Sequence, residues 1–226
     1  MLFRSYVLSI SPDYDLTEDI KKYIDFGIKS KTADMAIKAR EKHWPEKMGM
    51  WYSHINYQIN TKQPFGNVFL PDKVDTLFKN RGVFANYTES KTIATKNFHE
   101  IKVENVDIQK ILSLWYNSSI FLSIFLSTGK KISDRYIRML GIDHQNCLTL
   151  NADEIENSTK EEMLTFFDKI KYERFPPLKQ QYSENKFHQI RYELDYLVLK
   201  AICVEEKEET LKNLHKWMKV KLTEEK

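Results

Sequence analysis

Cysteine and glycine are scarce in this chain of 226 residues, and each shortage excludes a class of protein. Cys147 and Cys203 are too few for a disulfide framework, and neither lies in a Cys/His cluster with zinc spacing. We therefore expect a reducing compartment, the cytoplasm. The six glycines are isolated from one another, so the chain lacks the glycine-rich turn that lets a backbone approach a phosphate or an adenosyl group.

Long hydrophobic runs are also lacking. The longest, residues 111–126, is shorter than the roughly 20 residues that span a bilayer, and it contains Asn117 near its middle. We expect this stretch to be buried inside the protein, and we expect no membrane partner. The first ten residues have neither a long apolar core nor a small-residue cleavage site, so no secretory signal is expected.

Charge of one sign does not dominate the chain as a whole. Lys and Arg number 35 against 32 Asp and Glu, a net charge of +3, which excludes a polycation held to nucleic acid by bulk charge. The charge is nevertheless uneven, because residues 28–138 carry +8 and both ends of the chain are acidic. Such asymmetry is typical of a local face that binds a polyanion.

Apolar periodicity predicts an α+β fold in two parts. Residues 1–150 are expected to form one domain, with a mixed or antiparallel β-sheet region at about 50–150 flanked by helices, and residues 151–226 a helical extension packed on it. Strand signals occur at residues 6–10, 50–59, 66–70, 81–88, 94–103, 136–140 and 147–150. Helical spacing occurs at residues 16–27, 32–43, 106–127, 158–172, 185–203 and 210–222.

One catalytic pattern is present. Asp72, followed by Glu89-Ser90-Lys91, has the order used by metal-dependent nucleases, in which two carboxylates hold Mg²⁺ and a lysine aids the attacking water. The match is commonplace in a highly charged chain, and Glu89-Ser90-Lys91 follows a strand signal at a place where a polar hairpin turn is expected. A nuclease is one alternative, and it requires these three side chains to converge within about 5 Å of one Mg²⁺ position.

A series of motifs runs in order along nearly the whole chain. The most specific is ILSLWYNSS at residues 111–119. The others are YIDFG at 23–27, AREKHW at 39–44, ANYT at 85–88, TKNFHEI at 95–101, FPPL at 175–178 and RYELDYLVLKA at 191–201. In order and spacing they resemble the target recognition region of adenine-N6 DNA methyltransferases, restriction-modification enzymes in which a DNA-reading domain follows a methylase core.

The resemblance implies a domain that binds double-stranded DNA and has no catalytic activity in isolation. The family's methylase core carries a glycine-rich S-adenosylmethionine turn and an Asn/Asp-Pro-Pro-Tyr/Phe/Trp motif. Here the Pro-Pro pair of FPPL follows Arg174 and Phe175, and the turn is missing. We therefore expect no cofactor in this chain, with S-adenosylmethionine bound by a partner catalytic domain or subunit that flips the target adenine.

Cations, amides and aromatic side chains gather at four places in the basic segment, where they could contact phosphates and base edges. The four clusters are Arg40, Lys42, His43 and Trp44; Gln58, Asn60, Lys62 and Gln63; Lys91, Lys96, Asn97 and His99; and Lys130, Lys131, Arg135 and Arg138. Each cluster alone is equally well explained as a solvated surface. DNA binding requires that they converge in space.

Other polar residues favour structural roles. The Asn-Ser-Ser of residues 117–119 is expected to kink its helix or make polar packing contacts, and Trp115 to lie in the core. Arg191 and Asp195, four residues apart, are expected to form a structural ion pair. A second alternative is a structural or protein-interaction domain that docks through its acidic C-terminal helices.

Overall fold

The computed structural model describes residues 9–29, 51–62, 65–75, 78, 81–94, 97–133, 136–183 and 188–223. The chain divides into two compact units, residues 1–64 and 65–226, which are treated separately below. The predicted helix at residues 32–43 lies outside the described residues, as does most of the strand predicted at residues 6–10.

The described part of the first unit is irregular at residues 9–17 and otherwise helical. The predicted helix at residues 16–27 is confirmed as α1 (Glu18–Lys29), which has two acidic residues in its first turn and buries Ile24. Residues 50–59 were predicted as a strand, and this is wrong: they form the 3₁₀ turn η2 (Trp51–Ser53) and most of α3 (His54–Lys62). Their aromatic and β-branched side chains favour strands only in a sheet context, so local propensity is overridden here.

The second unit begins with a three-stranded antiparallel sheet in the order β3-β1-β4. The central strand is β1 (Phe65–Pro71), between β3 (Asn86–Ile93) and β4 (Phe98–Ile101). Val68 pairs with Tyr87 but Gly66 pairs with Thr92, so residues 88–91 bulge from the ladder. The polar turn predicted at Glu89-Ser90-Lys91 is therefore wrong, because this segment is an irregular part of a strand rather than its end.

A second antiparallel sheet has the order β2-β6-β5. Its strands are β2 (Lys73–Asp75), β5 (Lys130–Lys131) and β6 (Tyr136–Arg138). The strand predicted at residues 147–150 is wrong, since these residues are irregular chain after α6 (Gly141–Gln145). Leu150 is buried all the same, which shows that the apolar signal reported burial and not strand pairing.

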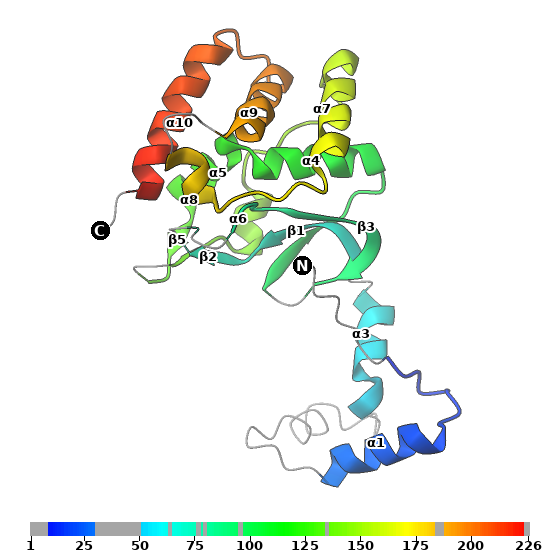
Figure 1. Cartoon of the computed structure of the whole chain (residues 1–226). Helices are drawn as coiled ribbons and strands as arrows, with labels where there is room; N and C mark the ends of the chain where they lie inside the picture. The colour runs from blue at the N-terminus through cyan, green and yellow to red at the C-terminus, as the bar shows by residue number, and fades with distance from the viewer. Residues whose placement is uncertain are drawn as a thin grey trace. The chain divides into compact units, whose positions relative to one another are not determined.

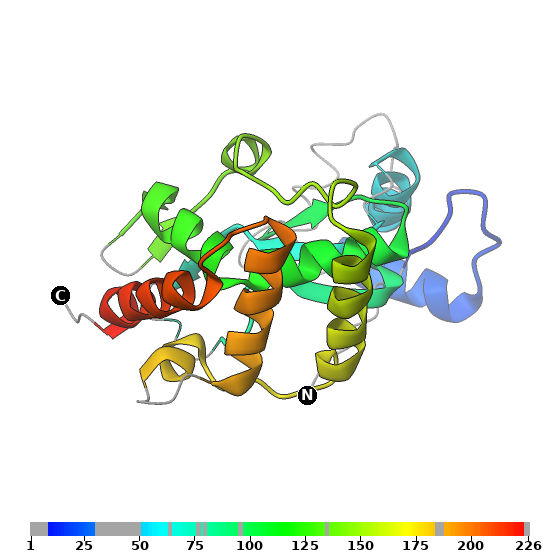
Figure 2. The ribbon, with the colours of Figure 1, turned by 90° about the horizontal axis from the view of Figure 1, so that it is seen from above.

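Helices cover one side of the sheets in two layers (Figure 1). The inner layer is α4 (Val106–Asn117) followed by α5 (Ser119–Thr128), which replace the single helix predicted at 106–127. The outer layer includes α7 (Asn157–Ile170), α9 (Gln189–Ala201) and α10 (Lys207–Thr223), with α8 (Leu178–Ser183) against α10. Seen from above, α7 and α9 lie side by side over α4 (Figure 2).

The hydrophobic core of the second unit lies between these layers. It includes Val68 and Leu70 of the first sheet, Phe121 and Phe125 of α5, and Val198 of α9, and it extends from residue 68 to residue 222. Small antiparallel sheets with a helical C-terminal part confirm the predicted α+β class. The predicted division at residue 150 stays a prediction, although this cluster takes residues from both sides of it.

The apolar stretch at residues 111–126 is buried as predicted, with Trp115 in the core. No single helix among the described residues has both the length and the hydropathy needed to cross a membrane. Helices α4 and α5 would meet those criteria only together, across a 60° bend.

Candidate functional site

The structure describes about half of the predicted DNA-contacting residues. Those outside the described residues are Arg40, Lys42, His43, Trp44, Gln63, Lys96 and Arg135. For Lys62 and Lys91 the main chain is described and the side chain is not. Gln58 and Asn60 belong to α3 of the first unit, where the Asn60 amide donates to Asn56 Oδ1 at 3.0 Å. The remaining predicted residues, Asn97, His99, Lys130, Lys131 and Arg138, all belong to the second unit.

Three cations stand directly opposite one another on the three strands of the second sheet. Arg138 of β6 pairs with Lys73 of β2 on one side and with Lys130 of β5 on the other. Neighbouring strands lie about 4.8 Å apart, so the three Cα positions span roughly 10 Å. We call Lys73, Arg138 and Lys130 the cationic row. Lys73 was missed by the sequence analysis, because nothing local marks it as the cross-strand neighbour of a residue 65 positions away.

Alternation along the strands places this row on the outer face of the sheet. Val74 and Ile137, each 4% exposed, point into the core from the same strands. Their immediate neighbours Lys73 and Arg138 therefore point to the opposite face. The side chains of Lys130 and Arg138 are 68% and 43% exposed, which leaves both accessible to a large ligand.

Asp72 connects the cationic row to the first sheet. This carboxylate is buried between the end of β1 and the start of β2, and its Oδ1 accepts a hydrogen bond of 2.9 Å from Arg138 Nε. His99 Nε2 of β4 lies 3.4 Å from the same oxygen and 3.2 Å from the Met139 carbonyl oxygen. The Asp72 main-chain N–H donates to the Asn97 carbonyl at 2.8 Å. Described members of two predicted clusters thus meet at one residue: His99 and Arg138 at the Asp72 carboxylate, and Asn97 at its main-chain N–H.

A second histidine and a second carboxylate complete the surroundings. The His144 ring lies 4.9 Å from the His99 ring, and neither of its nitrogens meets a hydrogen-bond partner among the described residues. Burial, together with the neighbouring His99, lowers the pKa of His144 to about 4. Asp143 accepts from the Leu140 N–H at 2.8 Å, and its other oxygen lies 4.0 Å from Lys130 Nζ.

This arrangement can bind an anion but offers no obvious catalyst. Arg138 uses Nε for Asp72, and no described residue accepts from its two terminal nitrogens, which can therefore donate to phosphate oxygens. Lysines on either side add two point charges. Within the described ranges, no group of three or more His, Cys, Asp or Glu side chains is arranged to hold a metal ion.

The residues of the nuclease alternative do not converge where they are described. Asp72 follows the last residue of β1, whereas Glu89 lies in the bulge opposite the first half of that strand. At about 3.3 Å per residue the two positions are roughly 15 Å apart along β1. Asp72 is paired with Arg138, and Glu89 Oε1 lies 3.1 Å from Lys171 Nζ. The geometry therefore gives the nuclease alternative no support.

The motif residues of α4, α5 and α9 form a buried polar network. Asn117 Oδ1 accepts from the N–H groups of Phe84 and Ala85 at 2.7 and 3.0 Å, and its amide donates to the Ala85 and Ser113 carbonyls. Ser118 caps the start of α5 by accepting from the Phe121 N–H at 3.1 Å. These contacts confirm the predicted kink and polar packing.

Arg191 and Asp195 are both buried, but they bond to different groups rather than to each other. Arg191 donates to Gln181 Oε1 at 3.0 and 2.9 Å and to the Asn117 carbonyl. Asp195 accepts from the Ser119 N–H and hydroxyl, and His215 Nε2 lies 2.6 Å from its Oδ2. The predicted structural role of Arg191 and Asp195 is confirmed. The predicted ion pair between them is wrong, because each bonds to groups on other helices.

Serine, histidine and aspartate meet in this network without forming a hydrolytic triad. The carboxylate of Asp195 stands between Ser119 and His215, so the histidine is not placed to take the serine proton. All three side chains are fully buried. The arrangement is a structural core that ties α5 to α9 and α10.

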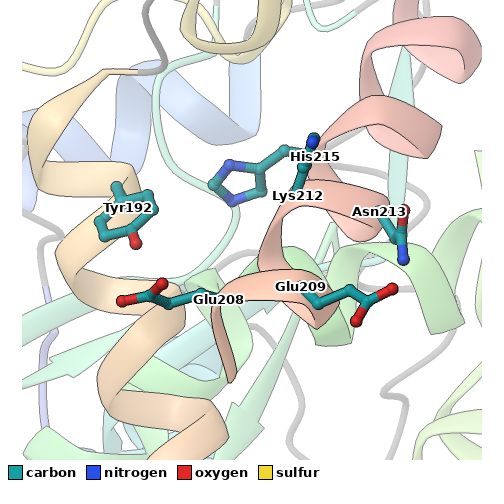
Figure 3. A pocket seen from close by; sticks show the side chains of 6 residues that line it. All are labelled: Tyr192, Glu208, Glu209, Lys212, Asn213 and His215. Carbon is teal, nitrogen blue, oxygen red and sulfur yellow. The ribbon is translucent and has the colours of Figure 1, made fainter. Parts of the chain in front are cut away.

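One pocket of about 560 Å³ opens beside this network, between α9 and α10 (Figure 3). In Figure 3 the His215 ring is directed toward Tyr192, and the two ring centroids are 6.4 Å apart. The pocket is lined by Tyr192, Glu208, Glu209, Lys212, Asn213 and His215. Two carboxylates against one ammonium group make it unsuitable for a polyanion such as DNA.

Comparison with known proteins identifies the fold. No family model matches the chain. No curated protein matches it either. Among solved structures, the type IIG restriction endonuclease BpuSI matches with a TM-score of 0.59 and 17% sequence identity, over 91% of this chain and 21% of that one. The chain spans about a fifth of the length of BpuSI, and it shares its fold with a segment of that restriction enzyme.

Proposed function

We propose that this chain is a DNA target recognition domain of the adenine-N6 methyltransferase type, which docks on duplex DNA through phosphate contacts. The observation that carries the proposal is the cationic row. The motif series at residues 23–201 and the fold shared with a segment of a restriction endonuclease support it. The methylase core, with its S-adenosylmethionine, would belong to another segment or subunit.

The electrostatics of the row favour a polyanion as ligand. Like charges directly opposite one another on adjacent strands destabilise a sheet, by up to about 1 kcal/mol for each pair. Lys73, Arg138 and Lys130 form two such pairs, and they are offset only in part by Asp72 and Asp143. Phosphates docked on the outer face would relieve this repulsion, and the release of their counterions would contribute to affinity.

Asp72 is a positioning residue in this proposal. Its bond to Nε fixes the plane of the Arg138 guanidinium group and leaves the outer edge of that group free for a phosphate. Since Asp72 is itself buried, its charge is held in place by Arg138 and His99 rather than by solvent. Removing its carboxylate would release Arg138 from this orientation without changing the number of cations.

The proposal is tested by salt-dependent binding of the full chain to duplex DNA. Replacing Lys73 and Lys130 together by Gln should weaken binding and reduce the slope of log affinity against log salt by about 0.9 for each phosphate that the variant no longer neutralises. The variant should be at least as stable as the parent, because it relieves like-charge repulsion. The control is Lys216→Gln at an exposed position of α10, which should leave affinity and slope unchanged.

Two results would overturn the proposal. One is duplex binding that is absent, or independent of salt, in the parent chain. The other is a Lys73→Gln, Lys130→Gln variant whose slope equals that of Lys216→Gln, since the cationic row would then make no phosphate contact.

A further inference from the structure

An exposed pair of side chains lies next to the cationic row. Tyr136 is two residues from Arg138 on β6 and so projects from the same outer face. Ile132 follows the end of β5, and its N–H donates to the Tyr136 carbonyl at 3.0 Å, which continues the β5–β6 hairpin by one pair. Ile132 is 52% exposed and Tyr136 39% exposed. We call Ile132 and Tyr136 the hairpin pair.

The surroundings of the hairpin pair select the chemistry of its partner. Scattered exposed apolar side chains are normal, but these two are cross-strand neighbours. Lys130 and Arg138 adjoin them on the same face and Asp75 stands opposite Tyr136, whereas Lys131 pairs with the inward-pointing Ile137. An apolar protein surface laid over this face would strip water from Lys130 and Arg138 without adding a compensating charge. Duplex DNA compensates the cations with phosphates and offers base edges and thymine methyl groups to the pair.

We propose that the hairpin pair enters the major groove and contacts base edges while the cationic row holds the adjoining phosphates. The major groove is about 12 Å wide, so side chains that project from the outer face of the sheet can reach base edges in it. Ile132 supplies apolar contact of the kind that a thymine methyl group accepts, and the Tyr136 hydroxyl can donate to or accept from a base edge. This inference rests on the proposed function and assigns sequence reading to two residues outside the predicted clusters.

The test is selection of binding sites from a random duplex library of about 20 base pairs, performed with the full chain and with Ile132→Ser and Tyr136→Ser variants. The parent should enrich a short sequence. The variants should lose preference at one or two adjacent positions of it, with discrimination there falling about tenfold. Their salt slopes should stay unchanged, because every phosphate contact remains. Tyr136→Phe separates the contribution of the hydroxyl from that of the ring.

Tyr172→Ser is the matched control, since this tyrosine at the end of α7 is 82% exposed and distant in sequence from the hairpin. It should select the same sequence as the parent. Thermal unfolding of each variant checks that an exposed substitution has not altered the fold.

The outcomes separate this inference from the proposed function. If Lys73→Gln, Lys130→Gln lowers the salt slope while the hairpin variants select the parental sequence unchanged, duplex docking stands and base reading by the hairpin pair is overturned. A parent that binds with a steep salt slope but enriches no sequence also overturns the inference. A parent without salt-dependent binding overturns the proposed function itself.

Discussion

Asp72 determines the geometry of the candidate site at the scale of single residues. A buried carboxylate is costly unless it is paired and hydrogen-bonded, and Asp72 meets this requirement with cationic or polar side chains from two different sheets. The sequence pattern suggested it as a metal ligand. The structure instead uses its charge to hold Arg138 beside Lys73 and Lys130. The role of this residue therefore follows from its neighbours and not from its motif.

His144 gives a prediction at the same scale. Its folded-state pKa, about 4, lies below the ordinary value of 6.5, so the unfolded chain binds the proton more readily. The stability linked to this histidine is fully present above about pH 6.5 and is lost as the pH falls toward 4. Melting temperatures of the parent should therefore decline over this range more than those of His144→Phe.

The difference between the two melting curves is the quantity to follow, because carboxylates elsewhere titrate in both proteins. A difference in melting temperature that stays constant from about pH 7 to about pH 4 would contradict the lowered pKa of His144. We expect the melting temperature of His144→Phe minus that of the parent to increase as the pH falls.

At the scale of elements, the break between α4 and α5 links the core to the site. Ser118 is both the C-cap of α4 and the N-cap of α5. Asn117 accepts from the main chain of Phe84 and Ala85, the two residues before β3, which starts later than the strand predicted from residue 81. Helix α5 then ends at Thr128, and its C-cap Gly129 directly precedes β5. A Cβ at Gly129 would lie 2.3 Å from Ile137 Cγ2, so glycine permits this close junction of helix and sheet.

The second prediction concerns Asn117→Ala. This change leaves the Phe84 and Ala85 N–H groups without their acceptor, and we expect a loss of about 2–4 kcal/mol in the free energy of unfolding. Urea denaturation measures it. The control is Asn105→Ala, which removes only the N-cap of α4 and should cost about 1 kcal/mol. Equal losses in the two variants would show that Asn117 acts as a local helix residue and not as a link to the β-region.

At the scale of the whole molecule, one continuous core unites the sheets and the C-terminal helices. The hydrophobic cluster of the second unit runs from residue 68 to residue 222. The fold is shared with a segment of a much longer restriction enzyme. A segment with its own core of this size can fold as an autonomous domain.

The third prediction follows from that core. A fragment of residues 65–226 should unfold in one cooperative thermal transition, with a far-ultraviolet circular dichroism spectrum rich in helix. A fragment of residues 65–150 should not, since it lacks the packing of α7 and α9 on α4 and of α10 on α5. Cooperative folding of the shorter fragment would instead support a domain boundary near residue 150.

Much of the fold could be predicted from sequence because its signals are local. Helical periodicity predicted α1, α7, α9 and α10, and the apolar run at 111–126 was correctly expected inside the protein. Residues 50–59 show the limit: their composition favours a strand, but whether a segment finds a sheet to join is not a local property. The bulge in β3 was not predicted for the same reason, because the register of a strand is defined only by its pairing with another strand.

Sequence patterns alone were enough to establish an α+β protein with a basic middle segment, and they marked His99, Lys130 and Arg138 as candidates. It took the folded chain to show that Lys73 stands beside Arg138 and Lys130, that Asp72 orients the arginine, and that Ile132 and Tyr136 are neighbours. The difference arises because periodicity and charge are properties of adjacent residues. Cross-strand neighbours are instead set by hydrogen-bonded register between strands, which for Lys73 and Arg138 are 65 residues apart.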